Sequence, residues 1–154
     1  CIDVSTIGIF IPGVTGTVAP YWKSELGTVK LGLEDAKNNE IIRAAMESIG
    51  FFVHDIINQM DLKDALPDML TASGGGARAP LLQFIADILM ITIGHISLKD
   101  RTAIGVLQLL YKKNTGHYLS VGAECDEIFE PRMKKVTRAK KLKHWKNALA
   151  QVGI

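Results

Sequence analysis

Three consecutive glycines, Gly74 to Gly76, separate a short apolar segment from a helix-forming one, and no other feature constrains the fold as strongly. Residues 68–72 can form a short strand. Glycine permits the positive φ angles, or the close approach of a ligand to the backbone, that a tight turn at the end of a strand requires. Pro80 suits the first turn of a helix. The pattern therefore predicts a strand, a tight bend and a helix in direct succession.

The segment after Pro80 has the spacing of an amphipathic helix. Its apolar residues recur at intervals of three and four, which places them on one helical face: Leu81, Phe84, Ile85, Ile88 and Leu89. The start of such a helix favours an anion such as a nucleotide phosphate, because the helix dipole and free backbone N–H groups point toward it. Three glycines can equally form no more than a tight packed turn. Asp87 is expected to make a structural hydrogen bond, since no second carboxylate accompanies it.

The remaining pattern predicts one mixed α/β domain over residues 1–154. Strands are expected within 6–11, 28–33 and 90–96, helices over 101–113 and near the C-terminus, and a loop over 114–122. A long helix capped by Asn38 or Asn39 should be the central core helix. Its expected buried face comprises Ile42, Ala45, Ile49, Phe52, Val53, Ile56 and Met60.

Composition and cysteine content are those of an intracellular globular domain. The chain has 154 residues, of which 47% are hydrophobic and 22% charged, enough for a sizeable core. Cys1 and Cys125 form no CxxC or metal-binding spacing, which indicates a reducing compartment. The longest apolar run, residues 84–96, contains Asp87 and is too short to span a bilayer. No targeting segment is visible, so we expect a cytoplasmic protein without membrane contact.

Basic residues are concentrated at the C-terminal end. Residues 132–154 contain eight Lys and Arg and no acidic residue, whereas residues 1–131 contain ten basic and sixteen acidic residues. A helix from about Pro131 onward would carry lysines around most of its surface and one apolar stripe. The stripe comprises Val136, Ala139, Leu142, Trp145 and Leu149. Such a surface could bind nucleic acid or acidic lipid. We favour an amphipathic closing helix docked by its stripe, and disfavour nucleic-acid binding.

Five segments, in the same order, resemble the C-terminal domain of the FGGY carbohydrate kinases, which include glycerol, xylulose and ribulose kinases. SGGGARAPLLQFIADIL, from Ser73, resembles the ATP-side motif of that family. Residues 11–32, containing APYW, and residues 41–49 resemble its proline-glycine segment and its RAxxE helix. DRTAIG at 100–105 resembles the start of the next helix. FEPRM at 129–133, followed by WKNA, resembles an ending seen mainly in glycerol kinases.

The resemblance implies a partial ribonuclease-H-like (actin-like ATPase) lobe, incomplete at its N-terminal side. It implies ATP with Mg²⁺ as the phosphoryl donor, and a polyol such as glycerol as the favoured acceptor. In the family, the catalytic base and most acceptor contacts belong to an N-terminal lobe that has no counterpart in this sequence. We therefore expect no catalytic residue here and no phosphorylation by this chain alone. Its expected partners are a nucleotide and the missing lobe, and homo-oligomerisation is left open.

The resemblance also assigns roles to individual residues. It places Gly74, Gly75 and Gly76 against the α-phosphate and ribose of the nucleotide, with Ala77 and Arg78 near the adenosine. No metal ligand is implied. Separately, Arg43 and Glu47 lie four residues apart on the long helix. We expect them to form an intrahelical ion pair or a bond to a neighbouring loop, and disfavour a role in catalysis.

A second hypothesis is a non-catalytic, kinase-derived interaction or regulatory module. It is motivated by the missing lobe and by Glu34 and Asp35, which stand where family members have a glycine turn beside the nucleotide. Two carboxylates there would place negative charge near an anionic ligand. ATP titration separates this hypothesis from that of a working nucleotide site.

Overall fold

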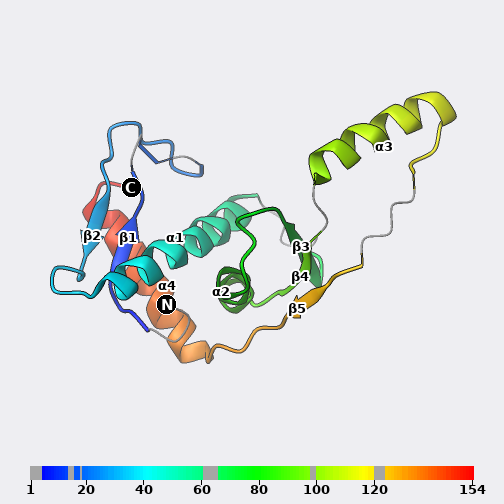
Figure 1. Ribbon diagram of the computed structural model, residues 1–154. Coiled ribbons are helices and arrows are strands. Elements are labelled where there is room, and N and C mark those ends of the chain that lie inside the picture. Colours follow the sequence, from blue (N-terminus) through cyan, green and yellow to red (C-terminus); the bar gives the residue numbers. More distant parts are fainter. Residues whose placement is uncertain (1–4, 14–15, 18, 61–65, 98–99, 120–123) are drawn as a thin grey trace.

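The structure, a computed structural model, describes residues 5–13, 16–17, 19–60, 66–97, 100–119 and 124–154. Two small sheets lie at opposite ends of a group of three helices (Figure 1). At one end, β1 (Ile9–Ile11) pairs antiparallel with β2 (Val29–Leu31). The helices are α1 (Asn38–Gln59), α2 (Ala79–Leu89) and α4 (Lys135–Gln151). The expected α/β class with a mixed sheet and flanking helices is confirmed. Cys1 and Gly122 lie outside the described residues.

The second sheet carries the glycine bend. Its order is β3 (Met69–Ser73), β4 (Thr92–Ile96) and β5 (Glu127–Phe129), with β4 parallel to β3 and antiparallel to β5. The helix α2 links β3 to β4 and covers one face of the sheet through Leu82 and Ala86, which pack on Ile93. The predicted succession of strand, bend and helix is confirmed. Because β3 and β4 are parallel, the bend and the residues after β4 lie at the same edge of the sheet.

An aromatic cluster joins the three central helices. The ring of Phe51 stacks on Trp145 at a centroid distance of 5.0 Å and meets Phe84 edge-on at 5.3 Å. Gly50 permits this packing, because a Cβ atom there would lie 2.5 Å from the Phe84 ring. The cluster holds α2, and with it the start of that helix, in a fixed position.

The long helix is confirmed, but the prediction of its buried face is largely wrong: none of the predicted residues is fully buried, although Phe52 packs against the core. The buried residues of α1 are Ala44, Glu47, Ser48, Gly50 and Phe51. By contrast, Ile42 is 55% exposed, and Ile49 and Met60 are exposed as well. The aromatic rings on α2 and α4 decide the face, since Phe51 packs between them. The cap prediction is also wrong: Lys37 is the N-cap residue, and its N–H donates to Glu40 at 2.9 Å.

The C-terminal helix α4 begins at Lys135, later than predicted, because hydrogen bonds to Asp87 hold the preceding residues outside the helix. The N–H groups of Arg132 and Met133 donate to Oδ1 of Asp87 at 2.6 and 2.9 Å, which confirms the structural role expected for Asp87. Only the second half of the predicted stripe is buried, at Trp145 and Leu149, with Ala148 beside them. The early stripe residues Val136 and Ala139 are exposed, so the stripe was predicted too long. The helix nevertheless docks by its apolar side.

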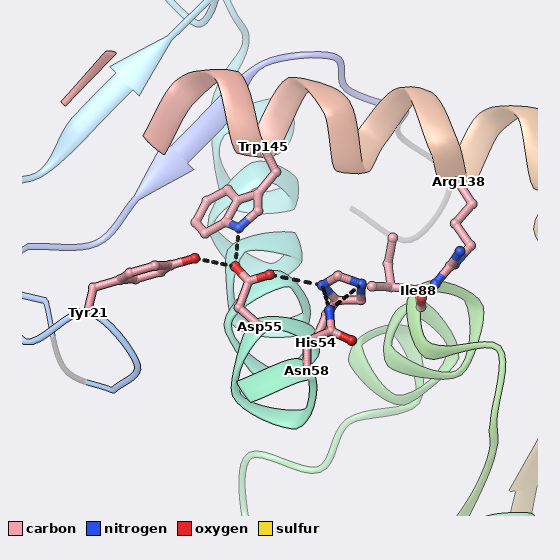
Figure 2. A network of polar contacts seen from close by, with 7 residues as sticks. All are labelled: Tyr21, His54, Asp55, Asn58, Ile88, Arg138 and Trp145. Carbon is pink, nitrogen blue, oxygen red and sulfur yellow. Dashed lines mark hydrogen bonds and ion pairs between the residues drawn. The ribbon is translucent and has the colours of Figure 1, made fainter. Parts of the chain in front are cut away.

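A polar network fixes the segment before β2 to two helices (Figure 2). Oδ2 of Asp55 on α1 accepts hydrogen bonds from the Tyr21 hydroxyl at 2.7 Å and from Nε1 of Trp145 at 2.6 Å. Oδ1 lies 2.9 Å from Nδ1 of His54. Burial alone would raise the pKa of Asp55, but the hydrogen bonds from His54, Trp145 and Tyr21 hold it below its ordinary value. Burial, together with Asp55, raises the pKa of Tyr21.

This network predicts a loss of stability in acid. Because the pKa of Asp55 is lower in the folded state than in the unfolded chain, its contribution is fully present above about pH 4 and is lost as the pH falls through the folded pKa. Asp55→Asn should remove this part of the pH dependence. Urea unfolding of both proteins between neutral pH and acid checks this. Identical pH dependence in the two proteins would contradict it.

The helix α3 (Arg101–Thr115) is confirmed as a helix but stands away from the rest of the molecule (Figure 1). None of its side chains is buried. Leu107 and Leu110 are 51% and 54% exposed, and Val106 and Tyr111 on the same side are exposed as well. Within the described ranges, no helix combines the length and apolar character needed to cross a membrane.

Candidate functional site

A cavity of about 740 Å³ opens where the carboxyl ends of β3 and β4 meet. This edge of a parallel sheet is where α/β proteins generally bind ligands. One wall is the glycine bend, and the other is formed by residues after β4 and by the first turn of α3. The lining residues are Ser73, Gly74, Gly75, Ala77, Arg78, His95, Ser97, Asp100, Arg101 and Thr102.

The chain's own conformation requires glycine at only one of the three bend positions. Gly74 has φ +99°, which disfavours any residue with a side chain. Gly75 and Gly76 do not have positive φ, and a Cβ atom at either would meet nothing within 4 Å. All three are exposed. Space for an approaching ligand would explain the two glycines that the fold does not need.

The bend uses some of its own backbone donors. The N–H of Ala77 donates to the carbonyl of Gly74 at 3.1 Å, and the N–H of Arg78 donates to that of Gly76 at 2.8 Å. These two groups close the turn and are occupied. An anion at the start of α2 would therefore have to bind N–H groups other than these two.

A second, apolar groove of about 450 Å³ lies on the other side of the bend. Its walls come from α1 and from the beginning of α2: Ile42, Arg43, Ala45, Met46, Ile49, Gly76, Arg78, Pro80 and Leu81. Arg78 borders both the cavity and the groove. The bend thus separates a space that is lined in part by polar and charged side chains from one that is almost entirely apolar.

All five residues predicted to bind nucleotide line one or both of these spaces. Their contact with a nucleotide stays a prediction. The sequence interpretation missed His95 and Ser97, although a strand, a helix and a second strand in succession imply parallel strands whose ends meet. It also missed the groove, because Ile42 and Ile49 were assigned to the core.

The charges around the cavity are mixed. Arg78 and Arg101 contribute positive charge and Asp100 negative charge. Nδ1 of His95 lies 3.6 Å from Oε2 of Glu127. The backbone N–H of Ser97 donates to Asp126 and lowers the pKa of that carboxyl. In the part of the chain that the structure describes, no group of three or more His, Cys, Asp or Glu is arranged to hold a metal.

Behind the groove lies a buried ion cluster. Oε1 of Glu47 accepts from Nε of Arg43 at 2.8 Å, which confirms the predicted intrahelical pair. Oε2 of Glu47 accepts from Nζ of Lys141 on α4 at 2.6 Å, a contact that the sequence did not reveal. Lys141 also donates to the carbonyl of Thr6 at 3.1 Å. Glu47 therefore links the groove wall to α4 and to the N-terminal segment.

Residues 6–110 match the family model of the C-terminal domain of the FGGY family of carbohydrate kinases. The chain is 33% identical over 152 residues to a glycerol kinase of Streptococcus pneumoniae, an alignment that covers 94% of this chain and 30% of that protein. To a glycerol kinase of Acinetobacter baylyi it is 32% identical over 154 residues, covering 94% and 31%.

Solved structures give the same result. The crystal structure of Plasmodium falciparum glycerol kinase with ADP superposes with a TM-score of 0.79 and 26% identity, covering 96% of this chain and 31% of that one. Ligand-bound xylulose kinase from Lactobacillus acidophilus shares the fold, with a TM-score of 0.74 and 24% identity over 93% of this chain and 31% of that one. The chain thus spans about three tenths of the length of the relatives it matches.

Proposed function

Because the chain belongs to the FGGY family of carbohydrate kinases, we propose that it is the nucleotide-binding C-terminal part of an ATP-dependent kinase for a polyol or sugar, with glycerol the favoured acceptor. Its fold is the expected ribonuclease-H-like (actin-like ATPase) lobe. In this proposal residues 1–154 form one domain of a longer catalytic unit. The glycerol kinases among its relatives support the choice of acceptor.

The glycine bend is the observation that carries the proposal. A nucleotide has a charged phosphate part and a flat, largely apolar base, so it needs two adjoining spaces of different character. The bend supplies them, with the cavity that contains polar and charged side chains beside Gly74 and Gly75, and the apolar groove beside Gly76. Arg78, between the two, can offer its guanidinium to either part of the ligand. We therefore place the phosphates and ribose in the cavity and the base in the groove.

The chemistry of the proposed reaction requires groups beyond this chain. Phosphoryl transfer needs a carboxylate to accept the hydroxyl proton and a metal ion to neutralise the phosphate charge. We propose that Mg²⁺ arrives bound to ATP, and that the base and the acceptor site belong to the remaining lobe. This chain alone then binds and orients the nucleotide without transferring its phosphate.

Two exposed apolar surfaces are suited to the remaining lobe. One is the side of α3 that carries Leu107 and Leu110. The other is the face of the β3–β4–β5 sheet opposite α2, where Met69 and Ile128 are exposed. Parallel sheets in α/β proteins are normally covered on both faces. We propose that polypeptide beyond this chain covers both surfaces.

Titration with ATP tests the proposed nucleotide site. The wild-type chain should bind Mg·ATP saturably, and Gly75→Val should weaken binding at least about tenfold, because the added methyl groups would fill the space next to the bend. Gly27→Val is the matched control, since a Cβ atom there also meets nothing within 4 Å and Gly27 lines neither space. Isothermal titration calorimetry and thermal unfolding measure both effects. Absence of binding at millimolar ATP would contradict the proposal and favour a non-catalytic interaction module.

A further inference from the structure

The buried ion cluster lies directly behind the groove proposed for the base. Arg43 lines that groove, while its Nε donates to Glu47 at 2.8 Å. The Glu47 side chain is only 4% exposed and lines no part of the groove. From this arrangement we infer that Glu47 is a positioning residue for nucleotide binding, acting through Arg43; the inference rests on the proposed function.

The composition and position of the cluster favour this role over a purely structural one. Burying a carboxylate is costly, and apolar side chains of similar volume often stabilise a protein as much as a buried ion cluster does. Here Arg43 and Lys141 both pair with the carboxylate of Glu47. Both cationic side chains are partly exposed, and Arg43 lies at the groove. The guanidinium of Arg43 is therefore held at the wall of the groove proposed for the base, where its planar face and N–H donors can contact the base.

The cluster also makes the position of Arg43 depend on the docking of α4. Lys141 holds the second oxygen of Glu47 and bonds the carbonyl of Thr6, so the carboxylate cannot rotate without losing a contact. The guanidinium carbon of Arg43 and Nζ of Lys141 lie 5.9 and 5.7 Å from the centroid of the Phe84 ring. The Phe84 ring and the fixed carboxylate of Glu47 together restrict Arg43 to one wall of the groove.

A double-mutant cycle for ATP binding, performed on the full chain, tests the inference. Glu47→Gln removes the charge that holds Arg43 and should raise the Kd for ATP about tenfold, the equivalent of about 1.4 kcal/mol. Arg43→Met should raise the Kd at least as much. In the Arg43→Met background, Glu47→Gln should add no further loss, because Glu47 acts through Arg43. Asp87→Asn is the matched control: Asp87 is another buried carboxylate, but it lies outside the groove, so this change should leave the Kd unchanged.

The outcomes are distinguishable. An unchanged Kd in Glu47→Gln, with only a lower thermal midpoint, would overturn the inference and leave the proposed function standing. Equal losses from Glu47→Gln with and without Arg43 would also overturn it. If the wild-type chain binds no ATP, the proposed function and the inference fail together. Should Glu47→Gln not fold, Glu47→Asp replaces it: this variant keeps the charge but draws Arg43 back, and an unchanged Kd would again overturn the inference.

Discussion

Trp145→Ala is expected to lower the free energy of unfolding by about 4 kcal/mol, a large share of the stability of a domain of this size. The indole is 2% exposed and stacks on Phe51, with Phe52 edge-on at 5.3 Å. Its removal leaves a cavity among three helices. It also removes the Nε1 donor that Asp55 accepts at 2.6 Å, so a buried carboxylate loses a partner.

The second tryptophan is a natural control. Trp22 is 73% exposed, and Trp22→Ala should change the free energy of unfolding by no more than about 0.5 kcal/mol. Urea denaturation followed by far-ultraviolet circular dichroism measures both variants. Comparable losses in the two would show that the aromatic cluster does not hold α1, α2 and α4 together.

The sequence predicted well those features that depend on neighbouring residues. The glycines and Pro80 determine the backbone conformation of the residues next to them, so the strand, the bend and α2 lie where expected. The same holds for the Arg43–Glu47 pair, whose members are one helical turn apart. Where three-dimensional neighbours decide the outcome, the predictions fell short. Nothing in the local pattern reveals that Lys141, far along the chain, completes the cluster around Glu47.

The buried face of α1 shows most clearly why the rest was not predictable. Two apolar stripes compete on this helix, and counting aliphatic residues selects the one with Ile42 and Ile49. The structure buries the one with Phe51, because the rings of Phe84 and Trp145 are there to receive it. Ile42 and Ile49 instead line the apolar groove. The groove of the candidate site was therefore missed because Ile42 and Ile49, which line it, were assigned to the core.

Leu107→Asp combined with Leu110→Asp is expected to separate folding from assembly. In the isolated chain both side chains are about half exposed, so the free energy of unfolding should change by no more than about 1 kcal/mol. Binding to the remainder of a glycerol kinase should weaken about a hundredfold or more, since two apolar anchors of an interface are lost. A helix of 15 residues is marginal in water without tertiary packing, which makes a covering partner the natural source of its stability.

The probe is the Streptococcus pneumoniae glycerol kinase from which the segment matching this chain has been deleted, with binding measured by calorimetry. Asn114→Asp, which adds a charge at an exposed polar position of α3, should leave binding unchanged. Leu82→Asp, at a side chain 2% exposed, should unfold the chain and mark the opposite extreme. If the α3 variant binds as well as the wild type, the covering polypeptide lies elsewhere. If the α3 double variant instead loses as much stability as Leu82→Asp, then α3 packs on its own domain, and Leu107 and Leu110 belong to the core.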